Sequence, residues 1–226
     1  MNKAVRTTLA AIVLSLASLS ATAQSLTTLY EGGIAESGNT FDLRATTKNL
    51  IVERFDISIS NAGPATTVAV YWRPGTSNGF ESNPAGWTLL GRTTVVSRGN
   101  RVPTPLPIGG LELIAGQTYG IYVNVETGGS IQYTRGSNVF SNQDLSLTTW
   151  HAKRNPVFTG PTFSPRMWNG TVYYTPAFTT CAAEGFIGPK LTLCRRVCEV
   201  SNPPATQTSL IKLYTAIYRE TPPCAN

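Results

Sequence analysis

The positions of the cysteines divide this 226-residue chain into two unlike parts. Cys181, Cys194, Cys198 and Cys224 all lie within the last 46 residues. The long cysteine-free part before them must be held together by a hydrophobic core of its own. The short part that carries the cysteines can bury too little apolar surface for that, so we expect it to depend on covalent crosslinks.

The first 23 residues have the pattern of a secretory signal peptide. Lys3 and Arg6 supply the positive charge, the apolar run 9–19 follows, and Ala21-Thr22-Ala23 has the small residues that a signal peptidase accepts. We therefore expect a mature chain that begins at Gln24 and is exported, to the periplasm or beyond the cell. The apolar run has about half of the roughly 20 residues needed to cross a bilayer, so we expect no membrane-spanning segment.

The charge of the chain argues against a nucleic-acid partner. The formal net charge is +6, and loss of Lys3 and Arg6 with the signal peptide leaves +4 (6 minus 2). These charges are scattered and form no run of five or more, whereas a phosphate-binding surface usually has a clustered basic stripe. Weak attraction to anionic cell surfaces or acidic polysaccharides is compatible with this composition.

Residues 24–176 have the period-two hydrophobic pattern of β-strands. Apolar and polar residues alternate, and Gly, Pro, Asn and Ser interrupt them at regular intervals, which is typical of half-buried antiparallel sheets. The clearest alternating segments are 55–59, 68–72, 119–125, 145–147 and 171–174. About nine short strands at this spacing predict an all-β fold, a two-sheet antiparallel sandwich with jelly-roll or Greek-key connections.

One segment of this region is rich in proline. Pro103, Pro105 and Pro107 occupy alternate positions and cannot donate to a strand ladder. We therefore expect an extended edge strand or a crossing between sheets at this place.

The pattern changes to a helical one in residues 177–226. Pro189 suits a first helical residue, and apolar residues at helical spacing run on to Cys198. Asn202-Pro203-Pro204 then ends that helix, and a second helix is predicted from about Gln207 to Arg219. The product is a two-helix hairpin too small to be stable without disulfides.

The pairing of the four cysteines has three formal solutions that the sequence does not settle. We favour Cys194 with Cys224 and Cys181 with Cys198, because Cys224 follows the returning helix. A zinc site is the alternative. Because an exported chain enters an oxidising compartment, disulfides are favoured over metal. We expect no metal and no cofactor.

Two parts of the chain resemble known domains. Tyr71-Trp72-Arg73, the run 103–111 (PTPLPIGGL) and the segment 163–171 (FSPRMWNGT) resemble a recurrent β-sandwich domain of exported bacterial proteins. The tail resembles a small C-terminal cysteine-rich module of exported proteobacterial proteins, in the segment 190–199 and in Pro222-Pro223-Cys224. Both resemblances imply a fold and an exported location. Neither family has an established function, so they imply no catalytic residues.

Few residues are suited to catalysis. His151 is the single histidine, and no Gly-x-Ser-x-Gly motif is present. We expect His151 to lie on a solvated loop beside Lys153 and Arg154. A glycosidase-like hydrolase using two carboxylates is the alternative function. Its candidate acids in this region are Glu31, Glu36, Asp42, Glu53, Asp56, Glu81, Glu112, Glu126 and Asp144.

Aromatic side chains are the better candidates for a functional surface. Adjacent Tyr71 and Trp72 must point to opposite faces of a sheet, and so must Tyr173 and Tyr174. One member of each pair can therefore present a ring to a sugar or peptide. As ligand-binding residues we single out Trp72, Trp150 and Tyr174. The predicted function is a non-catalytic binding protein whose partner is a glycan or a cell-envelope component.

Overall fold

The structure is a computed structural model that describes residues 23–177, 181, 184, 186–198 and 204–223. Residues 1–22 of the predicted signal peptide and Cys224 lie outside the described residues.

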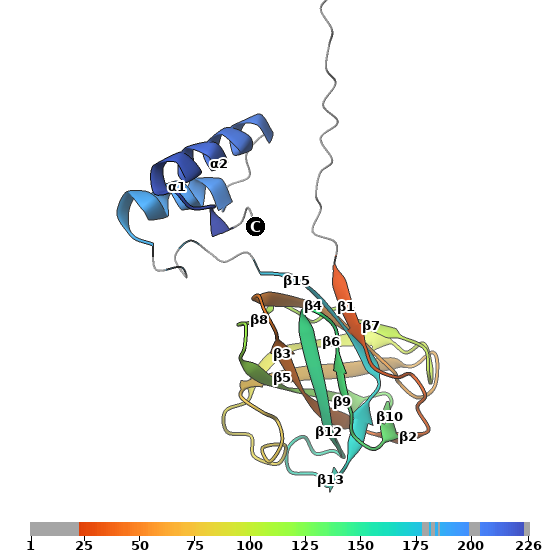
Figure 1. Cartoon of the computed structure of the whole chain (residues 1–226). Coiled ribbons are helices and arrows are strands. Elements are labelled where there is room, and N and C mark those ends of the chain that lie inside the picture. Colours follow the sequence, from red (N-terminus) through yellow and green to blue (C-terminus); the bar gives the residue numbers. More distant parts are fainter. Residues whose placement is uncertain (1–22, 178–180, 182–183, 185, 199–203, 224–226) are drawn as a thin grey trace, which may run out of the picture.

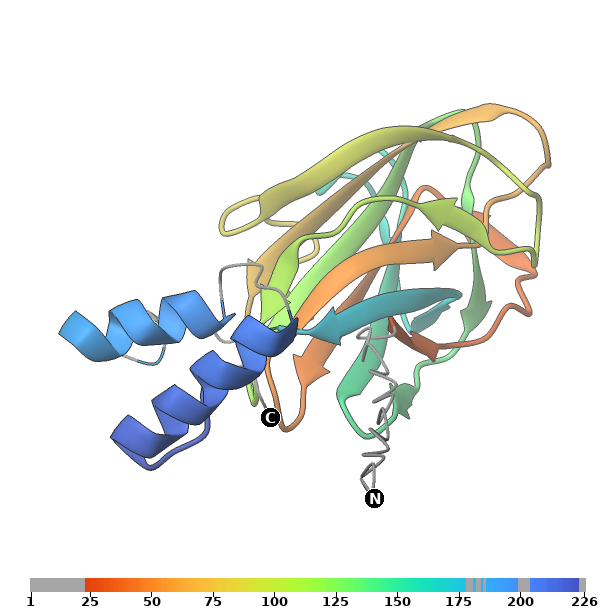
Figure 2. The ribbon, with the colours of Figure 1, turned by 90° about the horizontal axis from the view of Figure 1, so that it is seen from above.

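Residues 24–176 form three antiparallel sheets (Figures 1 and 2). The seven-stranded sheet contains β11 (Val139–Ser141), β12 (Leu145–Lys153), β3 (Gly38–Ala45), β9 (Thr118–Thr127), β5 (Ala65–Pro74) and β6 (Thr88–Val96) in that order, with β13 (Thr162–Phe163) beside β12. The five-stranded sheet contains β1 (Gln24–Thr27), β15 (Gly170–Pro176), β4 (Leu50–Ile57), β7 (Thr104–Leu106) and β8 (Leu111–Leu113). The smallest sheet contains β14 (Arg166–Trp168), β10 (Ile131–Arg135) and β2 (Ile34–Glu36).

One hydrophobic core joins the three sheets. The rings of Phe41 from β3 and Trp168 from β14 stack with centroids 4.2 Å apart, and Phe55 from β4 meets both rings edge-on. All three side chains are fully buried. The predicted all-β antiparallel sandwich is thus confirmed. It has fifteen strands among the described residues rather than about nine, because several extra strands are only two or three residues long.

The proline-rich segment lies at a sheet edge, as predicted. β7 pairs only with β4, and Pro105 is opposite Asp56 in that ladder. Since a proline has no N–H to donate, the outermost position of the sheet accommodates it without loss of a hydrogen bond.

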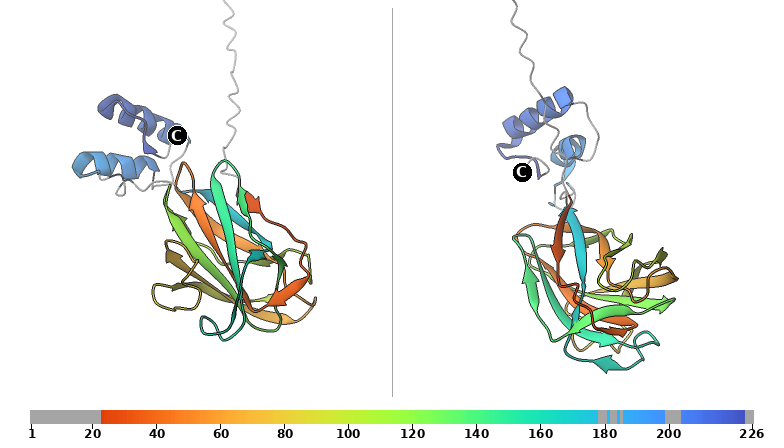
Figure 3. Two further views of the ribbon diagram at one scale, coloured as in Figure 1. Left: turned by 60° about the horizontal axis from the view of Figure 1, so that its bottom comes forward. Right: turned by 90° about the vertical axis from the view of Figure 1, so that its right-hand side faces the viewer.

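Two helices follow β15, α1 (Gly188–Cys198) and α2 (Pro204–Tyr218). They lie side by side outside the sandwich, beyond the end of β15 (Figures 1 and 3). The predicted hairpin is present, although α2 begins three residues earlier than expected because Pro204 serves as its first residue. Among the described residues, neither helix has the length and apolar character needed to cross a membrane. The predicted domain boundary between residues 176 and 177 stays a prediction.

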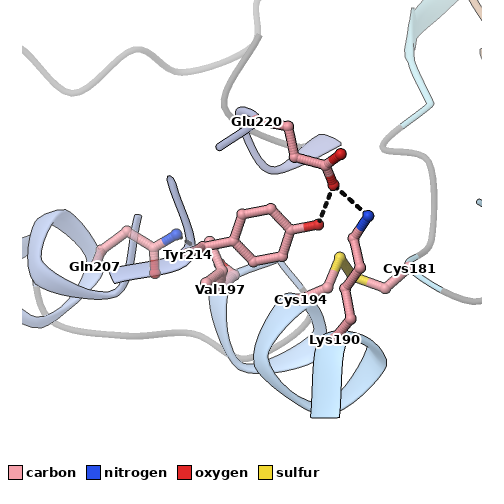
Figure 4. Close-up of a disulfide and its surroundings, with 7 residues drawn as sticks. All are labelled: Cys181, Lys190, Cys194, Val197, Gln207, Tyr214 and Glu220. Carbon is pink, nitrogen blue, oxygen red and sulfur yellow. Dashed lines mark hydrogen bonds and ion pairs between the residues drawn. A yellow bond between two sulfur atoms is a disulfide. The ribbon is translucent and has the colours of Figure 1, made fainter. Parts of the chain in front are cut away.

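A disulfide between Cys181 and Cys194 fastens the segment before α1 to the middle of that helix (Figure 4). The favoured pairing of Cys194 with Cys224 and of Cys181 with Cys198 is therefore wrong. The direction of the returning helix was a poor guide, because Cys181 lies within bonding distance of the middle of α1. Cys198 is also disulfide-bonded.

The hairpin has a small core of its own around this disulfide. Tyr214 from α2 is fully buried against Cys181, Cys194 and Val197. Its hydroxyl donates to Glu220, which also pairs with Lys190 of α1 (Figure 4). The buried Tyr214 ring and the ion pair of Lys190 with Glu220, just after α2, thus hold the two helices together, while the disulfide fastens the segment before α1 to α1.

Candidate binding face

The outer face of the seven-stranded sheet carries the most elaborate set of polar and aromatic contacts in the sandwich. Residues 75–87, between β5 and β6, fold back over this face and are called the anchored loop below. Gly120 of β9 permits the close approach, because a Cβ added there would lie 2.7 Å from the backbone nitrogen of Ser77. The loop therefore rests directly on the backbone of the sheet.

Asp42 of β3 holds the first part of the anchored loop. Its carboxylate accepts hydrogen bonds from the Thr76 hydroxyl at 2.6 Å and from the Ser77 amide and hydroxyl, both at 2.7 Å. Trp150 Nε1, from β12, donates a fourth at 2.9 Å. Asp42 is buried, so these four donors replace the water that its charge would otherwise require. The acid has a positioning role.

His151 and Lys153, two basic residues of β12, form hydrogen bonds with the rest of the loop. His151 Nε2 donates to Asn78 Oδ1 at 3.0 Å and lies 3.7 Å from Glu81 Oε2. Lys153 Nζ donates to Ser82 Oγ, to the Gly160 carbonyl and to Thr162 Oγ1 at 2.6–2.9 Å. Burial lowers the pKa of both His151 and Lys153. The loop is thus fastened from two neighbouring strands.

A group of half-exposed aromatic side chains lies where the anchored loop meets β5 and β6. The Arg73 guanidinium sits 3.5 Å from the Phe80 ring centroid and 5.9 Å from that of Trp87. Tyr71 lies two residues before Arg73 and therefore on the same side of β5, and its ladder partner Leu89 is 44% exposed. We call Tyr71, Arg73, Phe80, Trp87 and Leu89 the aromatic face.

The aromatic face rests on a rigid base. The Trp87 ring packs against Tyr122 of β9 and against Phe158, with centroids 6.0 and 5.9 Å apart, and its Nε1 donates to the Phe80 carbonyl. Tyr122 is fully buried and Phe158 nearly so. Because these contacts fix the rings before any ligand arrives, little conformational entropy would be lost on binding.

Two of the three predicted ligand-binding residues direct their rings toward the core of the sandwich. Trp72 packs against the core beside Tyr119, and Tyr174 is fully buried with its hydroxyl bonded to Asn142. Neither residue presents a ring on an outer face, and their role in ligand binding stays a prediction. Trp150 does lie on the outer face, half-buried, with its Nε1 engaged by Asp42. The structure does not bring the three residues together.

The residues that sequence reasoning missed are the partners of those it chose. In each adjacent pair one aromatic faces outward, but the outward member is Tyr71 in the first pair and Tyr173 in the second. The alternation of apolar and polar residues in β5 would have indicated which aromatic faces outward. Trp72 continues the apolar phase of Val68 and Val70, which are both buried, whereas Tyr71 shares its phase with Thr67 and Arg73.

The expectation for His151 is also wrong. This residue lies within β12, is only 8% exposed, and contacts the anchored loop. Lys153 is fully buried in the same strand, and only Arg154 lies beyond its end. The strand continues past the expected loop because a β-bulge between Thr149 and His151 keeps it paired with β3.

Most of the candidate acids are engaged by donors. Arg154 and Arg92 form two-pronged contacts with Glu36 and Glu126, and Lys48 pairs with Asp144. Arg54 and the Tyr173 hydroxyl bind Asp56, the Thr175 hydroxyl donates to Glu53, and Asn49 lies at the limit of hydrogen bonding to Glu112. Glu81 differs, since its Oε2 is buried without a hydrogen-bond partner and faces His151.

The sulfurs of the tail form the only metal-like cluster among the described residues. Sγ atoms of Cys181, Cys194 and Cys198 lie within 4.8 Å of one another. A zinc ligand must be a thiolate, and all three sulfurs are oxidised in disulfides. This cluster therefore does not fit a metal.

Comparisons with known proteins do not assign the chain to a family. No family model matches the chain, and no curated protein matches it.

Proposed function

We propose that this is an exported, non-catalytic binding protein that recognises a glycan of the cell envelope or its surroundings. The observation that carries the proposal is the aromatic face, in which half-exposed rings surround the guanidinium of Arg73 on a fixed support. Ligand sites typically combine ring surface with a few oriented polar groups. Tyrosine, tryptophan and arginine are also the residues that dominate binding energy at protein surfaces.

The chemistry of the aromatic face suits a sugar ring. The apolar C–H side of a pyranose can stack on Phe80 or Trp87, and its hydroxyls can bond to the Tyr71 hydroxyl and the guanidinium of Arg73. One Nη atom of Arg73 donates to the Thr76 carbonyl and its Nε is buried, so the other Nη is the donor that a ligand would use. The apolar side and the polar hydroxyls of a pyranose are thus matched by the rings and the polar groups of the aromatic face.

The hydrolase alternative has less support. A glycosidase needs one carboxylic acid that can give its proton to the leaving group and a second carboxylate at a suitable distance. Among the described acids of the sandwich, Glu36, Asp42, Asp56 and Glu126 have both oxygens occupied by the donors described above, and Asp144 has one oxygen paired with Lys48. Glu81 belongs to the anchored loop and is half-buried, with its Oε2 directed to His151 rather than to the exposed rings of the aromatic face.

Export supports the same proposal. The predicted signal peptide and the disulfide of the tail both suit an oxidising compartment, where glycans of the envelope are accessible.

A glycan array probed with the full mature chain tests the proposal. We expect retention on a subset of glycans, and loss of about tenfold or more in affinity for the variant Phe80→Ala/Trp87→Ala, from the removal of stacking and ring burial. The matched control is Tyr173→Ala, which removes a half-exposed aromatic ring from the outer face of the five-stranded sheet. No retention on any glycan, or equal losses in both variants, would contradict the proposal.

A further inference from the structure

A second surface, on the smallest sheet, brings two arginines together. Arg135 of β10 and Arg166 of β14 are direct partners in the antiparallel ladder. Side chains opposite each other in such a ladder leave from the same face with Cβ atoms about 5 Å apart. The ladder therefore forces two guanidinium groups onto one small area, called the arginine pair below.

The described residues do not neutralise the arginine pair. The Arg135 side chain is exposed and forms no hydrogen bond or ion pair with any residue that the structure describes. Arg166 donates one Nη to the Pro165 carbonyl at 2.7 Å, while its Nε is buried and has no partner among those residues. Like charges directly opposite destabilise a sheet. An anion bound between the two guanidinium groups would relieve this repulsion.

Aromatic rings lie beside Arg166 of the arginine pair and beside Arg154. The Arg166 guanidinium lies 5.9 Å from the ring centroid of Tyr133, and Arg154 lies 5.3 Å from that of Phe163. Burial raises the pKa of Tyr133, Glu36 adds to that shift, and a hydrogen bond with Arg166 and the positive charges of Arg166 and Arg154 oppose it. Glu36 is committed to Arg154 through two contacts of 2.7 and 3.0 Å. The local excess of positive charge thus remains with the arginine pair.

We propose that the arginine pair is a binding site for the oxyanion groups of an acidic polysaccharide. Guanidinium groups bind carboxylate, sulfate and phosphate oxygens in a two-pronged geometry, which a pair of arginines can apply from two sides. A polysaccharide fits better than a nucleic acid, because the positive charge is one local pair rather than a stripe along a backbone. This site is separate from the aromatic face, so the proposal does not depend on the proposed function.

The test measures retention of the full mature chain on three immobilised polymers: dextran sulfate, polygalacturonate and neutral dextran. We expect binding to one or both acidic polymers and none to neutral dextran, and the stronger acidic arm identifies the preferred oxyanion. Arg135→Gln/Arg166→Gln should weaken acidic binding about tenfold or more. Arg44→Gln/Arg92→Gln removes the same charge elsewhere and should change it less than about threefold.

A second measurement separates a binding role from a structural one. Arg135→Gln removes a repulsion, so its thermal unfolding temperature should equal or exceed that of the parent protein. Equal losses in the two double arginine variants, binding to neutral dextran that matches the acidic polymers, or a lower unfolding temperature for Arg135→Gln would overturn the proposal.

Discussion

At the scale of single residues, Asp42 shows how one buried carboxylate can fix the position of a loop through hydrogen bonds. It lies on the outer face of a sheet, where a solvated carboxylate is expected, yet it is buried and its oxygens accept four hydrogen bonds. Three of the donors belong to residues 76 and 77. The position of the anchored loop therefore depends on one carboxylate more than on any apolar contact at its beginning.

We predict that Asp42→Ala lowers the free energy of unfolding by about 2–4 kcal/mol, because it leaves four donors without their charged acceptor. Urea denaturation of the parent and the variant measures the difference. Glu126→Ala is the control, since the exposed pair of Glu126 with Arg92 should contribute about 0–1 kcal/mol. A loss no larger than that of the control would contradict the role given to Asp42.

His151 makes stability depend on pH in a defined direction. Burial lowers its pKa in the folded protein, whereas the unfolded chain has the ordinary value of about 6.5. Below that pH the unfolded state takes up the proton more readily than the folded state, so stability falls as the pH falls below about 6.5. Stability is fully present above that value.

Because His151 is the single histidine in the chain, one variant isolates the effect. The unfolding free energy of the parent should decrease between about pH 7 and pH 5.5, and that of His151→Gln should decrease much less over the same range. Urea titrations at several pH values measure both slopes. Identical slopes would show that His151 does not have the lowered pKa.

At the scale of elements, the anchored loop depends on a glycine in the strand below it. A Cβ at position 120 would lie 2.7 Å from the Ser77 nitrogen and 2.9 Å from its Cα, and both are backbone atoms that cannot rotate away. We predict that Gly120→Ala lifts the loop, costs about 1–3 kcal/mol and weakens glycan binding. Hydrogen exchange of residues 75–87 should accelerate.

The control for this variant is Thr94→Ala, on the same outer face but bonded to Thr67 rather than to the loop. It should leave exchange in residues 75–87 unchanged. If Gly120→Ala also leaves that exchange unchanged, the loop does not depend on the close approach.

The helical hairpin depends on its disulfide, since its own core is small. The bond closes a loop with a sequence separation of 13, for which the expected stabilisation is about 3 kcal/mol. We predict that Cys181→Ser/Cys194→Ser exposes residues 186–223 to limited proteolysis, identified by mass spectrometry, while the unfolding temperature of the sandwich hardly changes. A parallel loss of the sandwich would show that the two parts are coupled.

The elements differ in how far the sequence could predict them. Period-two alternation and proline placement were sufficient for the sandwich, for the edge position of Pro105 and for both helices, because these depend on local patterns. The disulfide pairing and the burial of His151 depend on contacts between distant segments, which a pattern within one segment does not contain. The outward aromatics are an intermediate case, since the phase of Val68 and Val70 would have indicated Tyr71 rather than Trp72.

At the scale of the whole molecule, the sandwich and the hairpin are stabilised by separate cores. The sandwich has one continuous core that joins three sheets, and the hairpin has a separate cluster around Cys181, Cys194 and Tyr214. The proposed binding surfaces both lie on the sandwich, which is the part that can hold side chains in place without crosslinks. We expect changes in the hairpin to alter the stability of the tail and not the choice of glycan.

The most direct test of this account is a hydrogen-exchange footprint of the full mature chain with a glycan selected on the array. The account predicts protection of residues 71–73, 75–87 and 88–91 on binding, with unchanged exchange in α1, α2 and the five-stranded sheet. Protection confined to the helices or to the five-stranded sheet would contradict the assignment of the aromatic face as the binding site.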